Sequence, residues 1–189
     1  MINILILPTC NEPGLEVFHS LILCNKLNIY CGSSKPYCKY DPTRILNQKQ
    51  YIELPLFDNP DFVNFLKKIS IKYKIDYIFP TTDELIHRLS REDFGKTKII
   101  CSDPKSTNIC LSKILTYKTL KRVIPIPKIY SKKNKKQQFP LYGKPDIGAG
   151  SKNHIFIEDN ESLKLAQKKK LLIMEYLPGE EYTVDCLSD

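Results

Sequence analysis

No hydrophobic run in this 189-residue sequence approaches the roughly 20 residues that a membrane-spanning helix needs. The apolar run over residues 2–7 is also too short for the core of a signal peptide, and no basic segment precedes it. Hydrophobic residues make up 42% of the chain and charged residues 26%, an ordinary balance for a globular protein. We therefore expect a soluble, cytoplasmic protein that does not interact with membranes.

The seven cysteines lack the C-x-x-C spacing that is typical of zinc and redox sites. Cys24, Cys31 and Cys38 recur every seven residues, but they fall on different predicted elements. We therefore predict no metal site, and free thiols in a reducing compartment. The three histidines, His154 among them, also lack the spacing of a ligand pair, and we predict that they are structural or exposed.

The formal net charge of +8 is unevenly distributed along the chain. Residues 1–103 have a net charge of +1, whereas residues 104–189 have a net charge of +7. The basic run over residues 132–136 lacks the interleaved aromatic side chains that stack on bases, so a solvated loop is the favoured interpretation. A basic nucleic-acid-binding protein is kept as an unlikely alternative.

Strand-like and helix-like segments alternate through the first hundred residues, which predicts a parallel sheet covered by helices. Residues 32–34 are predicted to break the second strand, and residues 35–50 to be irregular. Ligands of such sheets bind beyond the carboxyl ends of the strands, where we place the loops at 8–14 and 80–84. The predicted strands are 2–7, 27–31, 51–54, 76–79 and 98–101, and the predicted helices are 15–23, 60–73 and 85–89.

The pattern changes near residue 103, where we place a domain boundary. A helix is predicted over residues 111–121 and another over 161–168, with strands at 139–145, 154–157, 171–176 and 181–187. This order favours an α+β module with antiparallel strands. The predicted fold class is therefore α/β, with a small parallel Rossmann-like domain at 1–103 and an incomplete α+β module at 104–189.

A predicted strand that ends in Lys144 leads into a loop formed by Gly148, Ala149, Gly150 and Ser151. Glycine allows backbone N–H groups to turn toward an anion, and a nearby ammonium adds a positive charge for phosphate. These residue types together indicate a triphosphate site. The alternative is an ordinary hairpin turn that follows a surface lysine.

Two common nucleotide-binding motifs are missing from the sequence. Residues 139–151 do not match the G-x-x-x-x-G-K-[ST] pattern, which argues against a Walker-type NTPase. Residues 8–14 do not match G-x-G-x-x-G, which argues against a dinucleotide site in the first domain.

A second candidate segment combines an apolar strand with a turn and several acids. The backbone of Glu175, Tyr176 and Leu177 could pair with the edge of adenine. A carboxylate such as that of Glu181 can accept two ribose hydroxyls. The alternative is an ordinary Pro-Gly turn at 178–179 with solvated acids.

Two further segments complete an ordered set of four. The set comprises Asp76-Tyr-Ile-Phe-Pro-Thr-Thr-Asp-Glu84, the pair Ser112-Lys113, Lys144-Pro145 with Gly148-Ala-Gly-Ser151, and Glu175-Tyr-Leu-Pro-Gly-Glu-Glu181. In this order the segments resemble the ATP-grasp superfamily, particularly the branch related to the carbamoyl-phosphate synthase large chain. Each motif is weak by itself, but four in the right order are fairly specific. The resemblance extends over essentially the whole chain.

The resemblance implies a role for each candidate residue. Lys113 and Lys144 would contact the phosphates of ATP, and the loop at 148–151 would close over the β- and γ-phosphates. Glu175 and Leu177, which flank Tyr176, would meet adenine through their backbones, and Glu181 would hold the ribose. The loop continues as Ser-Lys-Asn where relatives often have a further glycine, so Lys152 would exchange flexibility for charge.

The resemblance also implies an activity. Relatives activate a carboxylate with ATP as an acyl phosphate, which an amine or similar nucleophile then captures. The implied cofactors are ATP and Mg²⁺, and the implied partners are ATP and a small carboxylate, with a homodimer as one open alternative. Catalytic residues and Mg²⁺ ligands would lie beyond Asp189. We therefore expect the N-terminal part of a ligase, inactive alone, or a non-catalytic nucleotide-binding remnant.

Within this scheme, residues 1–103 would be the domain that precedes the ATP-grasp domain, and residues 104–189 its N-terminal part. The strand that ends in Lys144 would form one wall of a nucleotide pocket and face the segment near Tyr176.

Overall fold

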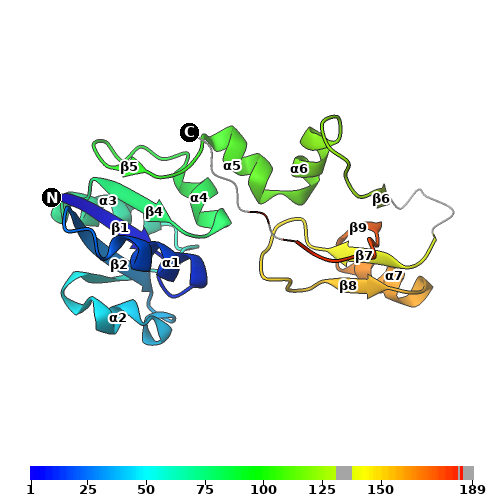
Figure 1. The fold of residues 1–189 in the computed structure, drawn as a ribbon, viewed down its shortest axis with the longest axis horizontal. Helices are drawn as coiled ribbons and strands as arrows, with labels where there is room; N and C mark the ends of the chain where they lie inside the picture. Colours follow the sequence, from blue (N-terminus) through cyan, green and yellow to red (C-terminus); the bar gives the residue numbers. More distant parts are fainter. Residues whose placement is uncertain (131–137, 183, 185–189) are drawn as a thin grey trace. The chain divides into compact units, whose positions relative to one another are not determined.

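The computed structural model describes residues 1–130, 138–182 and 184 (Figure 1). Two compact units are present, Met1–Leu111 and Ser112–Asp189. The predicted boundary near residue 103 stays a prediction about domain identity, since the compact units meet slightly later in the chain. The basic run at 132–136 and most of the predicted strand at 181–187 lie outside the described residues.

The first unit contains a five-stranded sheet of order β3-β2-β1-β4-β5, in which every pairing is parallel, as the alternation of segments predicted (Figure 1). Its strands are β1 (Ile2–Leu7), β2 (Leu27–Ser34), β3 (Tyr51–Leu54), β4 (Tyr77–Pro80) and β5 (Lys98–Ile99). Its helices are α1 (Glu12–Leu21), α2 (Thr43–Leu46), α3 (Phe62–Lys72), α4 (Asp83–Leu89) and α5 (Pro104–Leu111), with 3₁₀ helices η1 (Cys38–Tyr40) and η2 (Gln48–Gln50).

Both faces of this sheet are buried, which explains why β1 is apolar except for Asn3. Leu5 and Leu7 belong to a core cluster with Leu66 of α3. Ile6, which points to the other face, belongs to a second cluster with Phe18 of α1. Successive β1 side chains therefore anchor helices on opposite faces of the sheet.

The structure corrects the prediction that residues 32–34 break the second strand. β2 continues through residues 32–34. The close approach of the neighbouring strand leaves room there for small residues only. A Cβ on Gly32 would lie 2.9 Å from the carbonyl oxygen of Ile52 in the neighbouring strand. Ser33 and Ser34 are fully buried and make hydrogen bonds there. The segment 35–50, predicted to be irregular, contains η1, α2 and η2.

The predicted helix over residues 111–121 is α6 (Lys113–Leu120), and a further helix that was not predicted, α5, precedes it. The Asp103 carboxylate accepts hydrogen bonds from the backbone N–H groups of Lys105 and Ser106, at 2.9 and 3.1 Å. Together with the proline that follows it, Asp103 begins α5 in the way that helix N-termini commonly begin. Ser112 then caps α6 by accepting from Leu115 N–H.

The second unit contains a four-stranded sheet of order β6-β9-β7-β8, in which every pairing is antiparallel, as predicted. α7 covers one face of this sheet, where it forms a small core. The core consists of Leu141, Ile157, Leu163, Ala166 and Ile173. The elements besides α6 are β6 (Ile129–Tyr130), β7 (Leu141–Lys144), β8 (Ile155–Ile157), α7 (Asn160–Lys168) and β9 (Leu172–Glu175).

The loops that follow β1 and β4 meet at the carboxyl edge of the parallel sheet, as predicted. The Thr81 hydroxyl donates to the carbonyl oxygen of Pro8 at 2.7 Å, and the Asn11 side-chain amide donates to the carbonyl oxygen of Thr81 at 3.3 Å. The strand order reverses between β1 and β4, so these loops flank the point where sheets of this kind bind ligands.

Across the described ranges, no helix is both long and apolar enough to span a membrane.

Candidate functional site

The two faces of the antiparallel sheet differ in character. Leu141, Gly143 and Ile157 point toward α7, so the alternating residues Tyr142 and Lys144 point to the opposite face. Phe156 pairs with Tyr142 across the β7–β8 ladder and shares that face. We call this surface the lysine face.

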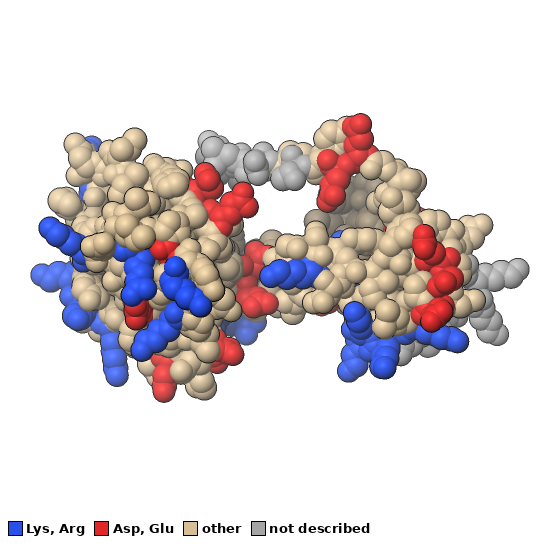
Figure 2. All heavy atoms as spheres, turned by 90° about the horizontal axis from the view of Figure 1, so that it is seen from below, with Lys and Arg blue, Asp and Glu red and all other residues tan. Residues whose placement is uncertain are grey.

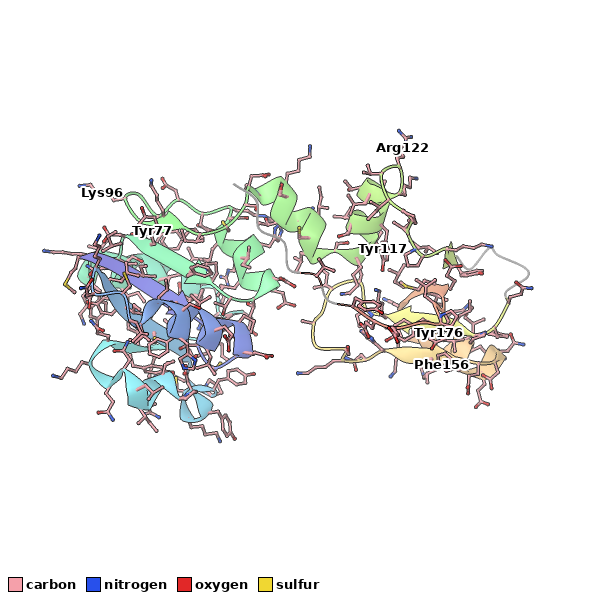
Figure 3. All side chains as sticks on the ribbon, viewed as in Figure 1. Tyr77, Lys96, Tyr117, Arg122, Phe156 and Tyr176 are labelled. Atoms are coloured by element: carbon pink, nitrogen blue, oxygen red, sulfur yellow. The ribbon has the colours of Figure 1, made fainter. Side chains whose placement is uncertain are left out.

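Lys144, at the end of β7, is held by α6. Its ammonium donates a hydrogen bond to the Tyr117 hydroxyl at 2.9 Å and lies 5.4 Å from the centre of the Tyr117 ring. Tyr117 is labelled on α6 in Figure 3. The helix therefore contacts the lysine face and keeps the ammonium in place without a carboxylate.

Asp146, in the segment after β7, accepts hydrogen bonds from residues at the start of α6. The Ser112 hydroxyl lies 3.0 and 2.9 Å from the two Asp146 carboxylate oxygens, and Ile114 N–H donates to one of them at 2.8 Å. Lys113 then extends its ammonium to the carbonyl oxygens of Asp146, at 3.2 Å, and Gly148, at 2.9 Å. The structure thus brings Lys113 to the predicted glycine loop.

Within the described residues, Lys113 and Lys144 have neutral partners only. The ion pairs found in the described part of the chain, Arg44–Glu53 and Lys67–Glu92, are both in the first unit. Lys113 contacts carbonyl oxygens and Lys144 contacts a hydroxyl and a ring. Two ammonium groups are therefore gathered without a paired carboxylate, which favours an anionic ligand there.

The loop at 148–151 requires glycine for its backbone conformation. Gly150 has a φ of +64°, and a Cβ added there would meet no atom within 4 Å. Ser151 and Asn153 also have positive φ values, of 52° and 62°. Asparagine tolerates this conformation better than most residues, so the turn forms without the further glycine seen in relatives. Gly148, Ala149, Gly150 and Ser151 are all exposed.

His154, which follows the loop, is half-buried against the lysine face. Its Nδ1 lies 2.5 Å from the Tyr142 hydroxyl, and the two rings meet edge to face with centres 5.4 Å apart. Burial, and then the positive charges of Lys144 and Lys113, lower the pKa of His154. This histidine was predicted to be structural or exposed, but continuing the β7–β8 register by one step beyond Gly143–Ile155 puts it opposite Lys144.

We call the predicted adenine-binding segment, residues 175–177, the hinge; it begins at the last residue of β9, which pairs directly with β7. Glu175 pairs with Leu141, whereas Lys144 pairs with Leu172, so the hinge and the lysine are three residue steps apart along the ladder. At 3.4 Å per residue this separation is about 10 Å. The two predicted segments therefore belong to one sheet.

The residues of the hinge differ in their surroundings. Glu175 N–H donates to the Lys128 carbonyl oxygen at 2.9 Å, so this donor is already used within the protein. Tyr176 packs edge to face on Phe156 with ring centres 4.9 Å apart, and both are partly exposed (Figure 3). Leu177 is 61% exposed. Glu181 is exposed, and no contact among the described residues joins it to the lysines.

Asp146 and His154 are the residues of this region that the sequence analysis missed. Asp146 contacts a helix cap 34 positions earlier in the chain, and a contact of that kind leaves no local pattern. His154 could have been noticed as a histidine at the far end of the loop from Lys144, but its pairing with Tyr142 depends on strand register.

The residues described here do not fit a complete Mg²⁺ site. Outside the masked positions, no group of three or more His, Cys, Asp or Glu side chains is placed to hold a metal ion. A hollow of about 590 Å³ lies wholly in the first unit, at the amino ends of β4 and β5, away from the residues considered above. It is lined by Ile71, Phe94 and three lysines.

On the face drawn in Figure 2, Lys and Arg side chains occur on both units, and acidic side chains occur on both as well.

Comparison with known protein families finds a match that covers the second unit. Residues 110–189 match the family model described as an ATP-grasp domain. The D-alanine–D-alanine ligases of Thermotoga maritima and Thermotoga sp. strain RQ2 are each 29% identical to the chain over 143 residues. These alignments cover 66% of this chain and 46% of each ligase, so the chain spans about half the length of these curated relatives.

Solved structures agree over nearly the whole chain. The carboxyaminoimidazole ribonucleotide synthase of Aspergillus clavatus, complexed with ATP, aligns with 94% of this chain and 47% of its own, at a TM-score of 0.66 and 11% identity. The L-amino acid ligase of Bacillus licheniformis aligns with 95% of this chain and 45% of its own, at a TM-score of 0.62 and 13% identity. At these identities the likeness establishes the fold alone.

The fold and the comparisons define an α/β protein whose residues 110–189 match an ATP-grasp domain. In sequence and in fold the chain resembles members of the ATP-grasp superfamily. Its narrower placement beside the carbamoyl-phosphate synthase large chain stays a prediction.

Proposed function

We propose that this chain is the front part of an ATP-dependent ligase and that its lysine face binds ATP. Residues 1–103 would be the domain before the ATP-grasp domain, and residues 104–189 the first part of that domain. One observation carries the proposal. Lys113 reaches the carbonyl oxygen of Gly148 in the glycine loop, Lys144 contacts Tyr117 on the same helix as Lys113, and among the described residues both ammonium groups have only neutral partners.

The sheet supports a definite orientation of the nucleotide. The phosphates would lie at the Lys144 end of β7, where Lys113 and the loop at 148–151 also lie. The adenine would lie about 10 Å away, at the end of β9, beside the exposed rings of Phe156 and Tyr176. In the part of the chain that the structure describes, the Leu177 N–H donates to no other group, so it could donate to the base.

Glu175 and Glu181 are the two acids that the proposal places at the adenine and the ribose. Because Glu175 N–H already donates to Lys128, only its carbonyl oxygen would serve as an acceptor for the adenine amino group. Glu181 as the ribose ligand rests on the resemblance alone. In our proposal it would reach the ribose only once the segment after Leu177 folds over the bound nucleotide.

The chemistry would be carboxylate activation. A carboxylate oxygen of the substrate attacks the γ-phosphorus of ATP, the bond to the β-phosphate oxygen breaks, and ADP leaves. An amine or similar nucleophile then attacks the acyl carbon and expels phosphate. Positioning and charge neutralisation dominate such transfers. Here Lys113 and Lys144 would orient the phosphates, while Mg²⁺, bound by residues outside those described, would supply further charge neutralisation.

The names of the relatives indicate which class of carboxylate to test first. The curated relatives are named D-alanine–D-alanine ligases, and one structural neighbour is an L-amino acid ligase. Amino acids are therefore the first carboxylates to assay. The loops at 8–14 and 80–84 would face them, because they flank the ligand edge of the parallel sheet.

Calorimetric titration with ATP tests the proposal. We expect the Lys144→Gln variant to bind ATP about tenfold more weakly or worse, since a charged hydrogen bond is worth roughly 1.5–3 kcal/mol. Lys164→Gln is the matched control, because Lys164 is an exposed lysine on α7, which covers the other face of the same sheet. Equal affinity in the wild-type protein and the Lys144 variant would contradict the proposed site.

A further inference from the structure

His154 and Tyr142 form a pair of titratable groups inside the lysine face. The Tyr142 hydroxyl lies 2.5 Å from Nδ1 of His154, and the rings pack edge to face. Continuing the β7–β8 register by one step beyond Gly143–Ile155 puts His154 opposite Lys144. The imidazole thus lies on the strand that returns from the glycine loop, next to the lysine that ends the outgoing strand.

The geometry points to His154 as a third cationic group of the phosphate-binding surface, one that takes up a proton when a nucleotide polyphosphate binds. This inference rests on the proposed function, because the anion that it requires is the polyphosphate of the bound nucleotide. It adds to that proposal a residue and a proton that the ATP-grasp resemblance did not assign.

The surroundings of His154 disfavour its protonated form before a ligand binds. Burial, and then the positive charges of Lys144 on β7 and Lys113 on α6, lower its pKa. Lys152 in the preceding loop adds a further positive charge nearby in sequence. Asp146, an acid in the segment that leads into the glycine loop, has its carboxylate occupied by Ser112 and by the N–H of Ile114.

A polyphosphate bound between the lysines would reverse this balance. Negative charge beside His154 favours the imidazolium form, whereas the lysines alone disfavour it. The Tyr142 hydroxyl suits both states, because it can donate to neutral Nδ1 and can accept from protonated Nδ1–H. Tyr142 therefore holds the ring in place while the charge changes.

The sign of the pH dependence follows from linkage. If binding raises the pKa of His154, the bound state holds more protons, and nucleotide affinity must rise as the pH falls through that range. The gain is about tenfold for each unit by which binding raises the pKa. Above both pKa values the histidine contributes nothing.

Proton uptake on binding provides the test. ATP binding is measured by calorimetry at pH 8.0 and pH 6.0, in buffers of different ionisation enthalpy, for the wild-type chain and for His154→Gln. ATP itself titrates in this range, but its contribution cancels in the difference between the two proteins. His19→Gln is the control, since His19 is an exposed histidine on α1.

We expect the wild-type protein to take up more protons than His154→Gln and to gain severalfold more affinity between pH 8.0 and pH 6.0, with His19→Gln matching wild type. In parallel, the C2–H resonance of His154, titrated by NMR in the whole chain, should show a pKa below 6.5 without ATP and a higher pKa with it.

The two proposals fail in different ways. Absence of ATP binding at both pH values overturns the proposed function, and the inference with it. ATP binding with equal proton uptake in wild type and His154→Gln, or an NMR pKa that ATP leaves unchanged, overturns the role of His154 alone.

Discussion

In the first unit, the carboxylate of Asp41 is almost fully buried and is surrounded by groups that donate to it. Hydroxyls of Thr9, Ser33, Thr43 and Tyr51 lie within 2.6–3.0 Å of its oxygens, and Thr43 N–H adds a further hydrogen bond. In the second unit, by contrast, the contacts of the Lys113 and Lys144 ammonium groups among the described residues are all with neutral groups. The acid of the first unit is thus satisfied within the protein, whereas the two lysines are the groups that we propose bind a ligand.

This difference separates structural polar clusters from binding sites. A buried acid whose acceptor positions are filled by the protein stabilises the fold, because each donor avoids the cost of burial without a partner. Like charges held close together repel one another, so such a cluster costs stability unless an oppositely charged ligand binds. We therefore expect substitution of Asp41 to affect stability and substitutions on the lysine face to affect ATP binding.

Removing the buried carboxylate should have the largest effect. Asp41→Ala leaves four hydroxyls without their acceptor, and we expect the free energy of unfolding of the first unit to fall by about 3–5 kcal/mol. Urea denaturation followed by circular dichroism measures this change. Asp58→Ala is the control, since Asp58 is exposed and should matter by less than about 0.5 kcal/mol. Similar losses in both variants would contradict a structural role for the cluster.

Alanine substitutions at Gly14 and Gly150 should distinguish a steric requirement for glycine from a requirement for its left-handed backbone conformation. A Cβ on Gly14 would lie 2.1 Å from the Pro8 carbonyl oxygen, so Gly14→Ala should cost the first unit about 2–3 kcal/mol through displaced backbone. Gly150 has open space around it but a left-handed backbone, so Gly150→Ala should cost about 1 kcal/mol. Thermal unfolding of both variants checks the order, and the reverse order would show that the conformation matters more than the clash.

The aromatic pair on the lysine face should matter more for binding than for folding. Phe156→Ala removes the edge-to-face contact with Tyr176, which is worth about 1 kcal/mol of stability, and we expect ATP affinity to fall severalfold. Leu165→Ala is the control, because Leu165 on α7 is 46% exposed, close to the 45% of Phe156. A change in ATP affinity that is equal in both variants would remove the aromatic pair from the site.

The smallest expected effect concerns His87, which joins α4 to α5 through a hydrogen bond of 3.0 Å between Nδ1 and the Thr107 hydroxyl. Burial, and then Arg91, lower the pKa of His87. The unfolded chain therefore binds the proton more readily, so stability is full above about pH 6.5 and falls as the pH drops below it. Urea midpoints at pH 7.5 and 5.5 should differ less for His87→Gln than for wild type, and identical differences would rule out this contribution.

Much of the first unit was readable from local pattern. The apolar run of β1 and its alternation with helices predicted the parallel sheet, and the two loops at its carboxyl edge meet as expected. The misreadings arose where local preference conflicted with packing. Gly32 and Ser33 suggested a turn, but the approach of β3 and the buried Asp41 carboxylate require small residues inside a strand.

The candidate site was predicted in part. Its residue types and their order indicated nucleotide binding, and the structure gathers Lys113, Lys144 and the glycine loop. The start of α5 was missed although Asp103 and the proline after it signal a helix N-terminus. The binding roles of these residues, and that of Glu181, remain predictions.

The sequence alone determined most of the strands and helices and the loop that needs glycine for its left-handed backbone, because these properties depend on near neighbours. Tertiary structure decided that Asp146 anchors α6, that Tyr142 contacts His154, and that two lysines 31 positions apart both act on His154. Such contacts depend on strand register and helix placement, which arise only when distant parts of the chain pack together.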